Sequence, residues 1–345
     1  MKHFTLPKEG GLVEKNIPSD ILHSYEKIRT EIYDQSTTAS EVIADEIIDS
    51  INACQGRTFK LGLSTGVTPV SLYKWLTRKY QEGKVSFSNV EVYSIDEYYP
   101  YGKGDIPDGS VPEDKITAYC EEYDKMVRGL DMLVIGMGEM AQVGFNEAGT
   151  SPVSRTRTVL LSYQSRKRQG KNFNGDFKHT PSQAITIGID TMMSAKKIVL
   201  MAWGEDKANA VKHVCECNPD YEYPASLLQG HQNICCYVDE TAGSLLTRVV
   251  SPWLVGPCDW TRKFIRKAVV WLCQEVHKPI LKLTQKDYLE HSLGELLDKF
   301  GPYDKINIEV FNDLQHTITG WPGGKPNADD SQRPVSALPY PKTVL

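Results

Sequence analysis

The chain has 345 residues, 40% hydrophobic and 24% charged, which is ordinary for a soluble globular protein and long enough for one large domain with an appendage or two modest domains. The formal net charge of −5 and the lack of a long Lys/Arg run argue against a general nucleic-acid binder. No apolar stretch reaches membrane-spanning length, and the first residues lack the apolar core of a signal peptide. We therefore expect a cytoplasmic protein without a membrane partner.

From about residue 36 to residue 250, strand-like and helix-like segments alternate, which is the pattern of a parallel sheet covered on both faces. Strands are predicted at 58–63, 90–95, 132–135, 184–187, 197–202 and 234–238. Helices are predicted at 40–53, at 69–80 with Thr68 as N-cap, and from about residue 205. The sequence thus predicts an α/β fold, a modified doubly wound (Rossmann-like) and mainly parallel sheet with helices on both faces.

The character of the sequence changes after Leu246. Apolar spacing predicts helices at 262–276 and 287–300 and a short strand at 306–311, and a polar, proline-rich segment begins at about residue 320. The predicted organisation is a domain over 1–250, an α/β C-terminal extension over 251–319, and a linker or tail over 320–345.

The eight cysteines predict neither a metal site nor a disulfide framework. Cys235-Cys236 and Cys215-x-Cys217 lack the spacing of zinc ligands, and the other four cysteines are solitary. We expect reduced and mostly buried thiols, and no metal.

Two polar features follow predicted strands in the first part of the chain. The loop Ser64-Thr65-Gly66-Val67-Thr68 precedes a predicted helix, whose first N–H groups are unpaired and attract an anion such as phosphate. The alternative is a Gly/Thr turn kept for packing alone. Asp96 follows the next strand and would place a carboxylate at the sheet edge where ligands bind in this architecture. Its alternative is a capping or turn aspartate.

Two further features follow later strands. Glu147 lies just beyond the turn Gly136-Met137-Gly138, so it would be near Asp96 if the two strands are neighbours, and paired carboxylates can divide acid and base roles. Lys207 opens a predicted helix after Gly204 and could pair with a phosphate. The alternatives are a solvated helix-start residue and an ordinary surface lysine. Taken together, the four features indicate one anionic ligand of about the size of a sugar.

The segments that carry these residues resemble the glucosamine-6-phosphate deaminase/isomerase family, whose relatives include the 6-phosphogluconolactonases. The resemblance runs in family order over roughly residues 30–250 and rests on these segments: 61–69 (LGLSTGVTP), 96–99 (DEYY), 144–147 (GFNE), 154–157 (SRTR), 184–188 (AITIG), 204–207 (GEDK) and 224–229 (PASLLQ). It implies a Rossmann-like α/β fold and a hexose or amino-sugar 6-phosphate as ligand. It implies that the reaction needs no redox cofactor and no metal.

The resemblance also implies roles for individual residues. Asp96 would move a proton between C2 and C1 of the open-chain sugar, and Glu147 would orient a histidine that assists ring opening. The residues that would bind substrate and its phosphate are Ser64, Thr65, Gly66, Thr68, Gly138 and Lys207. A basic residue on a mobile lid would also contact phosphate; Arg166, Arg168 and Lys171 occupy that region, and Lys171 is the expected match.

The chain departs from the family pattern at several positions. The ring-opening histidine is replaced by Gln142, and the position two before it, often acidic in the family, is Met140. A neutral amide can orient a hydroxyl but cannot exchange protons near neutral pH, and loss of one acid–base group typically costs ~10²–10⁴ in rate. The connection over 99–106 is short, and Val67 stands where a smaller residue is usual.

Two hypotheses follow. The first is an enzyme of the deaminase/isomerase type that uses Asp96, with Glu147 and Gln142 at the altered ring-opening position. The second is a non-catalytic sugar-phosphate binding protein with a degenerate active site. A homo-oligomer is compatible with both. Residues 253–330 resemble the connector of longer two-domain relatives in which a deacetylase-like metal domain follows, but no metal motif occurs in these residues.

Overall fold

The structure is a computed structural model that describes residues 11–12, 17–54, 56–101, 107–170, 173, 175 and 177–319. Contacts divide the chain into two compact units, Met1–Asp259 and Trp260–Leu345, each described here by itself. The first unit ends at Asp259, whereas the predicted first domain ends at residue 250. The three-part division into 1–250, 251–319 and 320–345 stays a prediction, since 320–345 lies outside the described residues.

The first unit is built on a six-stranded sheet in which every neighbouring pair is parallel, in the order β2-β10-β9-β6-β3-β4. Its strands are β2 (Arg29–Tyr33), β3 (Phe59–Leu63), β4 (Val90–Ser94), β6 (Met132–Gly136), β9 (Ile198–Ala202) and β10 (Ile234–Asp239). The predicted α/β class and parallel sheet are confirmed. β2 was not predicted, because its sequence RTEIY is half polar.

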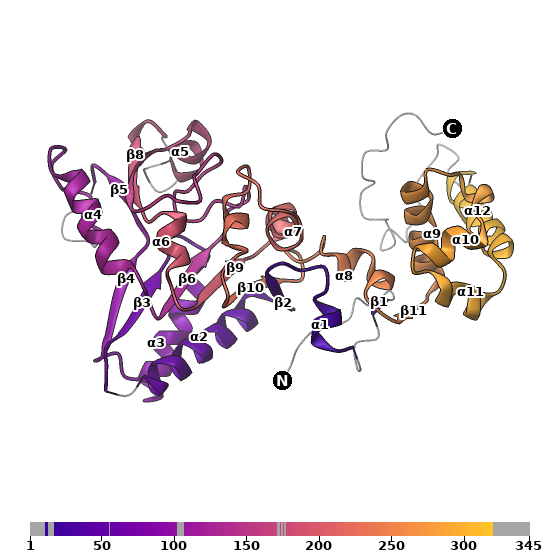
Figure 1. Ribbon diagram of the computed structural model, residues 1–345, viewed down its shortest axis with the longest axis horizontal. Helices are drawn as coiled ribbons and strands as arrows, with labels where there is room; N and C mark the ends of the chain where they lie inside the picture. The colour runs from indigo at the N-terminus through magenta and orange to yellow at the C-terminus, as the bar shows by residue number, and fades with distance from the viewer. Residues whose placement is uncertain are drawn as a thin grey trace. The chain divides into compact units, whose positions relative to one another are not determined.

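Helices cover both faces of this sheet (Figure 1). Side chains alternate along β6: Met132 and Val134 pack into one apolar cluster, Leu133 and Ile135 into the other. The first cluster includes α2 (Ser36–Ala53) and α3 (Val70–Gln81), and the second includes α4 (Ile116–Val127), α6 (Ile189–Met193) and α7 (Ala208–Glu216). Burial on both faces explains why the central strands are continuous apolar runs.

A second sheet of three antiparallel strands, in the order β5-β8-β7, continues from the first. Its strands are β5 (Asp96–Tyr99), β7 (Arg157–Leu160) and β8 (Gln183–Thr186), and α5 (Tyr163–Gln169) follows β7. Ile95 joins the two sheets, since its N–H donates to the Leu63 carbonyl (3.1 Å) and its carbonyl accepts from the Ile187 N–H (2.9 Å). The predicted strand 90–95 therefore ends where the chain changes sheets, and Asp96 is the first residue of the second sheet.

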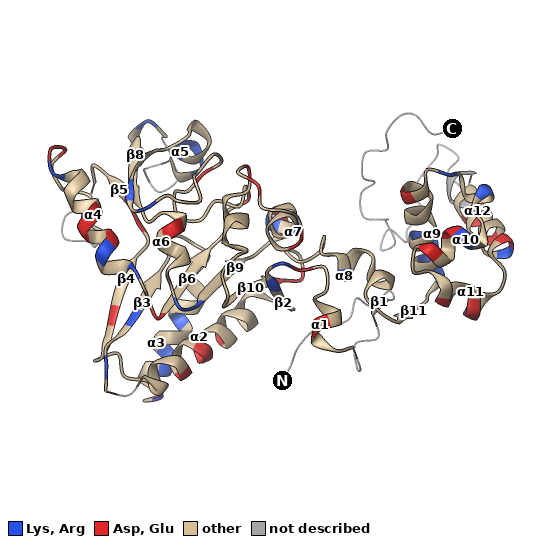
Figure 2. Cartoon of the chain, viewed as in Figure 1, with Lys and Arg blue, Asp and Glu red and all other residues tan. Residues whose placement is uncertain are grey.

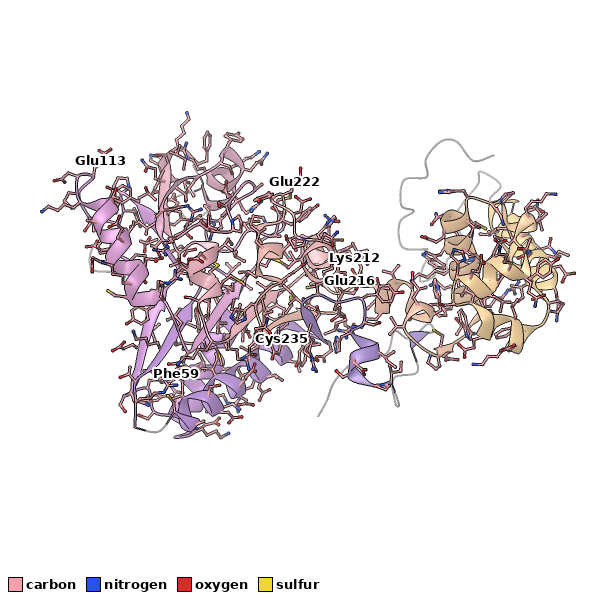
Figure 3. All side chains as sticks on the ribbon, viewed as in Figure 1. Phe59, Glu113, Lys212, Glu216, Glu222 and Cys235 are labelled. Carbon is pink, nitrogen blue, oxygen red and sulfur yellow. The ribbon has the colours of Figure 1, made fainter. Side chains whose placement is uncertain are left out.

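Short elements complete the first unit: β1 (Gly11–Leu12) pairs antiparallel with β11 (Cys258–Asp259), and α1 (Ser19–Leu22) and α8 (Thr247–Val250) lie near the ends of the unit. Helix α7 is tied to α8 through Glu216, which accepts from the Thr247 N–H at 2.8 Å and pairs with Lys212 (Figure 3). Lys212 also donates to the Thr247 hydroxyl at 2.8 Å.

The described part of the second unit is helical. It consists of α9 (Arg262–Val276), α10 (Gln285–Glu290), α11 (Gly294–Phe300) and α12 (Tyr303–Thr319), with a 3-10 turn, η7 (Ile280–Lys282). The predicted strand at 306–311 is wrong, because this segment lies within α12, where Ile306 and Val310 are buried one turn apart while Ile308 is exposed. The predicted helix at 287–300 is two helices, broken at Ser292, whose φ is 62°. Of the predicted α/β extension over 251–319, the part from Trp260 to Thr319 is therefore α, and its only strand among the described residues is the short β11 (Cys258–Asp259).

Helix hydrophobicity and the distribution of charged residues bear on which partners the chain can have. Among the described residues, no helix is both long and apolar enough to span a membrane. Positions with Lys or Arg and positions with Asp or Glu are interspersed over the helices, strands and loops of the ribbon (Figure 2).

Candidate active site

The candidate residues that the structure describes lie at the carboxyl edge of the parallel sheet, in the loops that follow β3, β4, β6 and β9. These four strands are adjacent in the sheet, and the strand order reverses at β3, since β4 lies on one side of it and β6 and β9 on the other. Open α/β sheets bind ligands at such a switch point. The Ser64 hydroxyl accepts from the Gly136 N–H across this point at 3.1 Å, so the two loops are held together.

The loop after β3 is fixed at both ends. The Tyr73 hydroxyl donates to the Ser64 carbonyl, and the Trp203 indole donates to the Thr68 carbonyl at 3.0 Å. Gly66 has a φ of 86°, which favours glycine. Val67 is 74% exposed. Helix α3 has Pro69 rather than Thr68 as its N-cap residue, so that prediction is wrong; the Thr68 side chain instead packs on Gly136, where an added Cβ would lie 2.9 Å from it.

Asp96 is buried beneath this loop. The Thr65 hydroxyl donates to its Oδ1 at 2.8 Å, and Gly144 lies so near that an added Cβ would be 3.2 Å from Oδ2. Burial raises the pKa of Asp96 to about 6, the Thr65 hydrogen bond lowers it in part, and the charge of Glu97 raises it. A carboxyl group with this pKa is ionised at neutral pH and readily takes up a proton, as a general base requires.

Replacement of Thr65 by valine is expected to raise the pKa of Asp96 further, because the valine cannot donate to the carboxylate. The acid limb of the pH–kcat/KM profile should then move up by about 0.5–1 unit, the equivalent of one lost hydrogen bond. Thr65→Ser, which keeps the hydroxyl, is the control and should leave the limb in place. An unmoved limb in the valine variant would show that a group other than Asp96 sets it.

The loop after β6 folds back on itself at Gln142. The Gly138 N–H donates to the Gln142 carbonyl at 2.9 Å, and the Met140 N–H donates to the Gln142 side-chain oxygen at 3.0 Å. The amide lies over Gly138, where an added Cβ would come within 2.1 Å of it. Ala141 has a φ of 56°, in the left-handed region that favours glycine. Gln142 therefore stabilises the turn, and its oxygen is engaged with Met140, which is 54% exposed.

The Phe145-Asn146-Glu147 segment links this loop to the second sheet. The buried Asn146 amide donates to the Val143 and Ile187 carbonyls at 2.9 and 2.8 Å and accepts from Arg157 at 3.1 Å. The Glu147 Oε2 accepts from the Ser162 N–H at 3.2 Å, while its Oε1 is buried without a hydrogen-bond partner in the described part of the chain. No hydrogen bond between described residues joins Glu147 to Asp96 or Gln142, so the expected carboxylate pair is not in direct contact.

Lys207 lies in the loop after β9 as the N-cap residue of α7. Its side chain is 17% exposed and contacts the carboxylate of Asp206, which is 57% exposed. Gly204 precedes it with a φ of 92°, and its N–H donates to the Asp239 carboxylate at 3.0 and 3.1 Å. The loop is therefore anchored to the end of β10, and the lysine carries a positive charge at the sheet edge.

Of the three basic residues considered for the lid, Lys171 lies outside the described residues. Arg166 donates to the Thr180 carbonyl at 3.2 Å and lies over the ring of Phe177. Arg168 forms an ion pair with Glu139 in the loop after β6. Arg168 is therefore the one of the two described arginines that reaches this loop.

An aromatic cluster beside the site was not predicted. Tyr98 lies 5.4 Å from Phe145, 5.0 Å from Phe173 and 6.0 Å from Tyr101, measured between ring centroids. Tyr98 and Phe145 belong to the two motifs that supply Asp96 and Glu147. The aromatic residue in each motif was the feature of the sequence from which this cluster could have been predicted. Within the described ranges, no group of three His, Cys, Asp or Glu residues is arranged to hold a metal ion.

Comparison with known proteins decides the family. The glucosamine-6-phosphate deaminase of Oceanobacillus iheyensis is 31% identical over 242 residues, which cover 62% of this chain and 94% of that protein. That of Beutenbergia cavernae is 34% identical, over 54% of this chain and 81% of that protein. The chain belongs to the glucosamine-6-phosphate deaminase family. No family profile matches it.

A longer member of the family is similar over most of the chain. A glucosamine-6-phosphate deaminase-like protein of Bacteroides thetaiotaomicron is 42% identical over 361 residues, which cover 96% of this chain but 54% of that protein. The chain thus spans about half the length of this relative.

Solved structures agree with the family assignment. A monomeric glucosamine-6-phosphate deaminase superposes with a TM-score of 0.60 at 30% identity, covering 63% of this chain and all of that one. The 6-phosphogluconolactonase of Leishmania guyanensis superposes with a TM-score of 0.50 at 17% identity over 63% of this chain and 98% of that one, which shows a shared fold.

Proposed function

We propose that this family member binds an amino-sugar or hexose 6-phosphate and moves a proton between C2 and C1 of the open-chain sugar, with deamination when C2 carries an amino group. The observation that carries the proposal is Asp96, a buried carboxyl group with a pKa of about 6 at the carboxyl edge of the sheet. A cytoplasmic location is part of the proposal. The eight cysteines of the chain are all free thiols, which agrees with a reducing compartment.

The proposed chemistry uses Asp96 as the base. Its carboxylate takes the C2 proton of the open-chain aldehyde and returns it to C1, while the aldehyde oxygen O1 gains a proton and the C2 amine loses one. An amino sugar thus passes through an enolamine to an imine at C2. Water then hydrolyses the imine, giving a ketose phosphate and ammonia. These steps need neither a redox change nor a metal. Ring opening needs a proton at the ring oxygen, which the neutral amide of Gln142 does not supply. We therefore propose that the sugar opens without help from Gln142.

Phosphate binding is assigned to Lys207 and the loop Ser64–Thr68. The supporting observations are the partly buried lysine after β9 and the backbone of the loop after β3, because β9 and β3 both flank β6 in the sheet. A positive charge and backbone N–H donors are suited to a phosphate dianion.

The alternative is a sugar-phosphate binding protein without turnover. One observation favours it: Gln142 is fixed against Gly138 by the Met140 hydrogen bond, and Glu147 contacts the Ser162 backbone. In this arrangement neither residue assists ring opening.

Proton NMR of glucosamine 6-phosphate with the protein in D₂O tests the two functions. Formation of fructose 6-phosphate, or deuterium at C2, is expected if Asp96 acts as the base. Saturation transfer without either signal would support the binding protein. The absence of both would contradict both functions for this sugar, and other hexose phosphates would then be measured in the same way.

Lys207→Ala is expected to weaken hexose 6-phosphate binding by roughly 10–100-fold, the equivalent of one charge-assisted hydrogen bond of about 1.5–3 kcal/mol. Isothermal titration calorimetry gives the affinity. Lys125→Ala is the control, because Lys125 is exposed and paired with Glu122 on α4. Equal affinities for the Lys207→Ala variant and the unmodified protein would refute the phosphate assignment.

A further inference from the structure

The lysine assigned to phosphate has an acidic neighbour in contact with it. Asp206 forms an ion pair with Lys207, and no other hydrogen bond or ion pair of Asp206 occurs within the described residues. The Asp206 carboxylate also lies over Gly204, where an added Cβ would be 2.8 Å from its Oδ1. The absence of a Cβ at Gly204 therefore leaves room for the carboxylate beside the lysine side chain.

The other carboxylate of this region is already engaged. Asp239 accepts from the Gly204 N–H with both oxygens, and its Oδ1 also accepts from the Thr241 hydroxyl and the Ala242 N–H, both at 2.8 Å. It is therefore a structural acceptor that anchors the loop. Asp206 is more than half exposed, and exposed ion pairs are weak because water solvates the separated charges nearly as well. Asp206 can therefore move away from Lys207 at little cost.

The same arrangement occurs on the neighbouring loop. Arg168 at the end of α5 forms an ion pair with Glu139, in the loop after β6. Both pairs are partly exposed, with side-chain exposures of 36% and 41% for Arg168 and Glu139. At each of the loops after β6 and β9, a cation is thus paired with a carboxylate of the chain itself, and at the loop after β6 the cation comes from α5.

We infer that Asp206 competes with an anionic ligand for Lys207 and thereby lowers the affinity of the site. This inference rests on the proposed function, in which Lys207 binds the phosphate. A ligand must displace the Asp206 carboxylate to reach the lysine. A phosphate monoester, with a charge between −1.5 and −2 at pH 7, replaces a singly charged carboxylate with a net gain in attraction. A sugar acid with one carboxylate replaces one singly charged group by another and gains little attraction. Asp206 therefore weakens the binding of both ligands, and the phosphorylated sugar is the one that still gains attraction when it displaces the carboxylate.

The test compares Asp206→Asn with Glu205→Gln, measured by calorimetry at low ionic strength with glucose 6-phosphate and with glucuronate. Glu205 is the matched control, because it is exposed, adjacent in sequence, and has no hydrogen bond or ion pair with Lys207. Asp206→Asn should bind glucose 6-phosphate about 2–5-fold more tightly, the upper part of the range of one exposed ion pair, and should bind glucuronate more tightly by a similar factor, since the same ion pair is removed. Glu205→Gln should change either affinity by less than about 2-fold.

A double variant separates this inference from the proposed function. In the Lys207→Ala background, Asp206→Asn should no longer tighten binding, since the two residues interact directly. Equal effects of Asp206→Asn and Glu205→Gln, or an effect that persists without Lys207, would overturn the inference and leave phosphate binding intact. If Lys207→Ala does not weaken glucose 6-phosphate binding, the proposed phosphate site fails, and the inference fails with it.

Discussion

Asp96→Asn is expected to lower the rate of deuterium incorporation at C2 by ~10²–10⁴, because the amide cannot accept the substrate proton. The substitution keeps the size of the side chain and an oxygen that can accept from the Thr65 hydroxyl. Substrate binding should therefore persist, and saturation-transfer NMR would measure it separately from turnover. In the unmodified protein, kcat/KM should fall as pH drops through about 6, where Asp96 takes up its proton.

The same substitution is expected to stabilise the fold near neutral pH. The folded-state pKa of Asp96 is raised from 3.8 to about 6, so the folded protein binds this proton more tightly than the unfolded chain. The contribution of this group to the free energy of unfolding is fully present below pH 3.8 and is lost as pH rises through 6. The total loss is about 3 kcal/mol. The asparagine variant avoids this loss. Its Tm should exceed that of the unmodified protein by several degrees at pH 7.5, and the difference should vanish near pH 4.

Asp131→Asn is the control for this stability effect. Arg57 and Lys196 donate to Asp131 at 2.8 and 2.7 Å and hold the pKa of its carboxyl well below its usual range. Its substitution should destabilise the protein at neutral pH, the opposite of the Asp96 result. An Asp96→Asn variant that is less stable than the unmodified protein at pH 7.5 would show that burial of the ionised Asp96 carboxylate does not destabilise the fold.

The parallel sheet could be predicted because its central strands have a simple pattern. Met132–Gly136 and Ile198–Ala202 are buried on both faces and read as continuous apolar runs. Arg29–Tyr33 and Arg157–Leu160 could not be recognised, since polar residues interrupt the first and the second is mostly half-buried or exposed. The alternation of apolar and polar residues at 306–311 led to the wrong prediction of a strand. Ile306, Ile308 and Val310 alternate with other residues there, but the helix buries only two of the three.

The positions of the candidate residues could be predicted, but their side-chain contacts could not. Parallel strands end at one edge, so Thr65, Asp96 and Lys207 were expected there from their places in the chain. The position of the Gln142 amide over Gly138 depends on the backbone of the turn over 138–142, and the contact of Glu147 with Ser162 depends on a residue distant in sequence. These contacts, rather than the motif letters, determine which residues can exchange a proton with a sugar.

Gln142→His is expected to raise the rate of deamination of glucosamine 6-phosphate by roughly 10–100-fold, because an imidazole can exchange protons with the ring oxygen near neutral pH. The gain should be smaller than the full ~10²–10⁴ of a well-oriented acid–base group, since Glu147 contacts Ser162 and does not orient position 142. The pH–kcat/KM profile should acquire a further limb near the histidine pKa of about 6.5. Ammonia release measured over pH 5–9 gives both quantities.

The dependence on enzyme concentration shows which step the histidine changes. With Gln142 present, turnover should level off at high enzyme concentration, because the spontaneous opening of the sugar ring becomes limiting. The histidine variant should continue to accelerate with added enzyme, since the protein itself then opens the ring. Gln142→Asn is the control: it also lacks a proton-exchanging group and should behave like the unmodified protein. Equal rates in the histidine and asparagine variants would mean that ring opening is not the step altered in this chain, and the exposed Met140 beside the turn would become the next residue to replace.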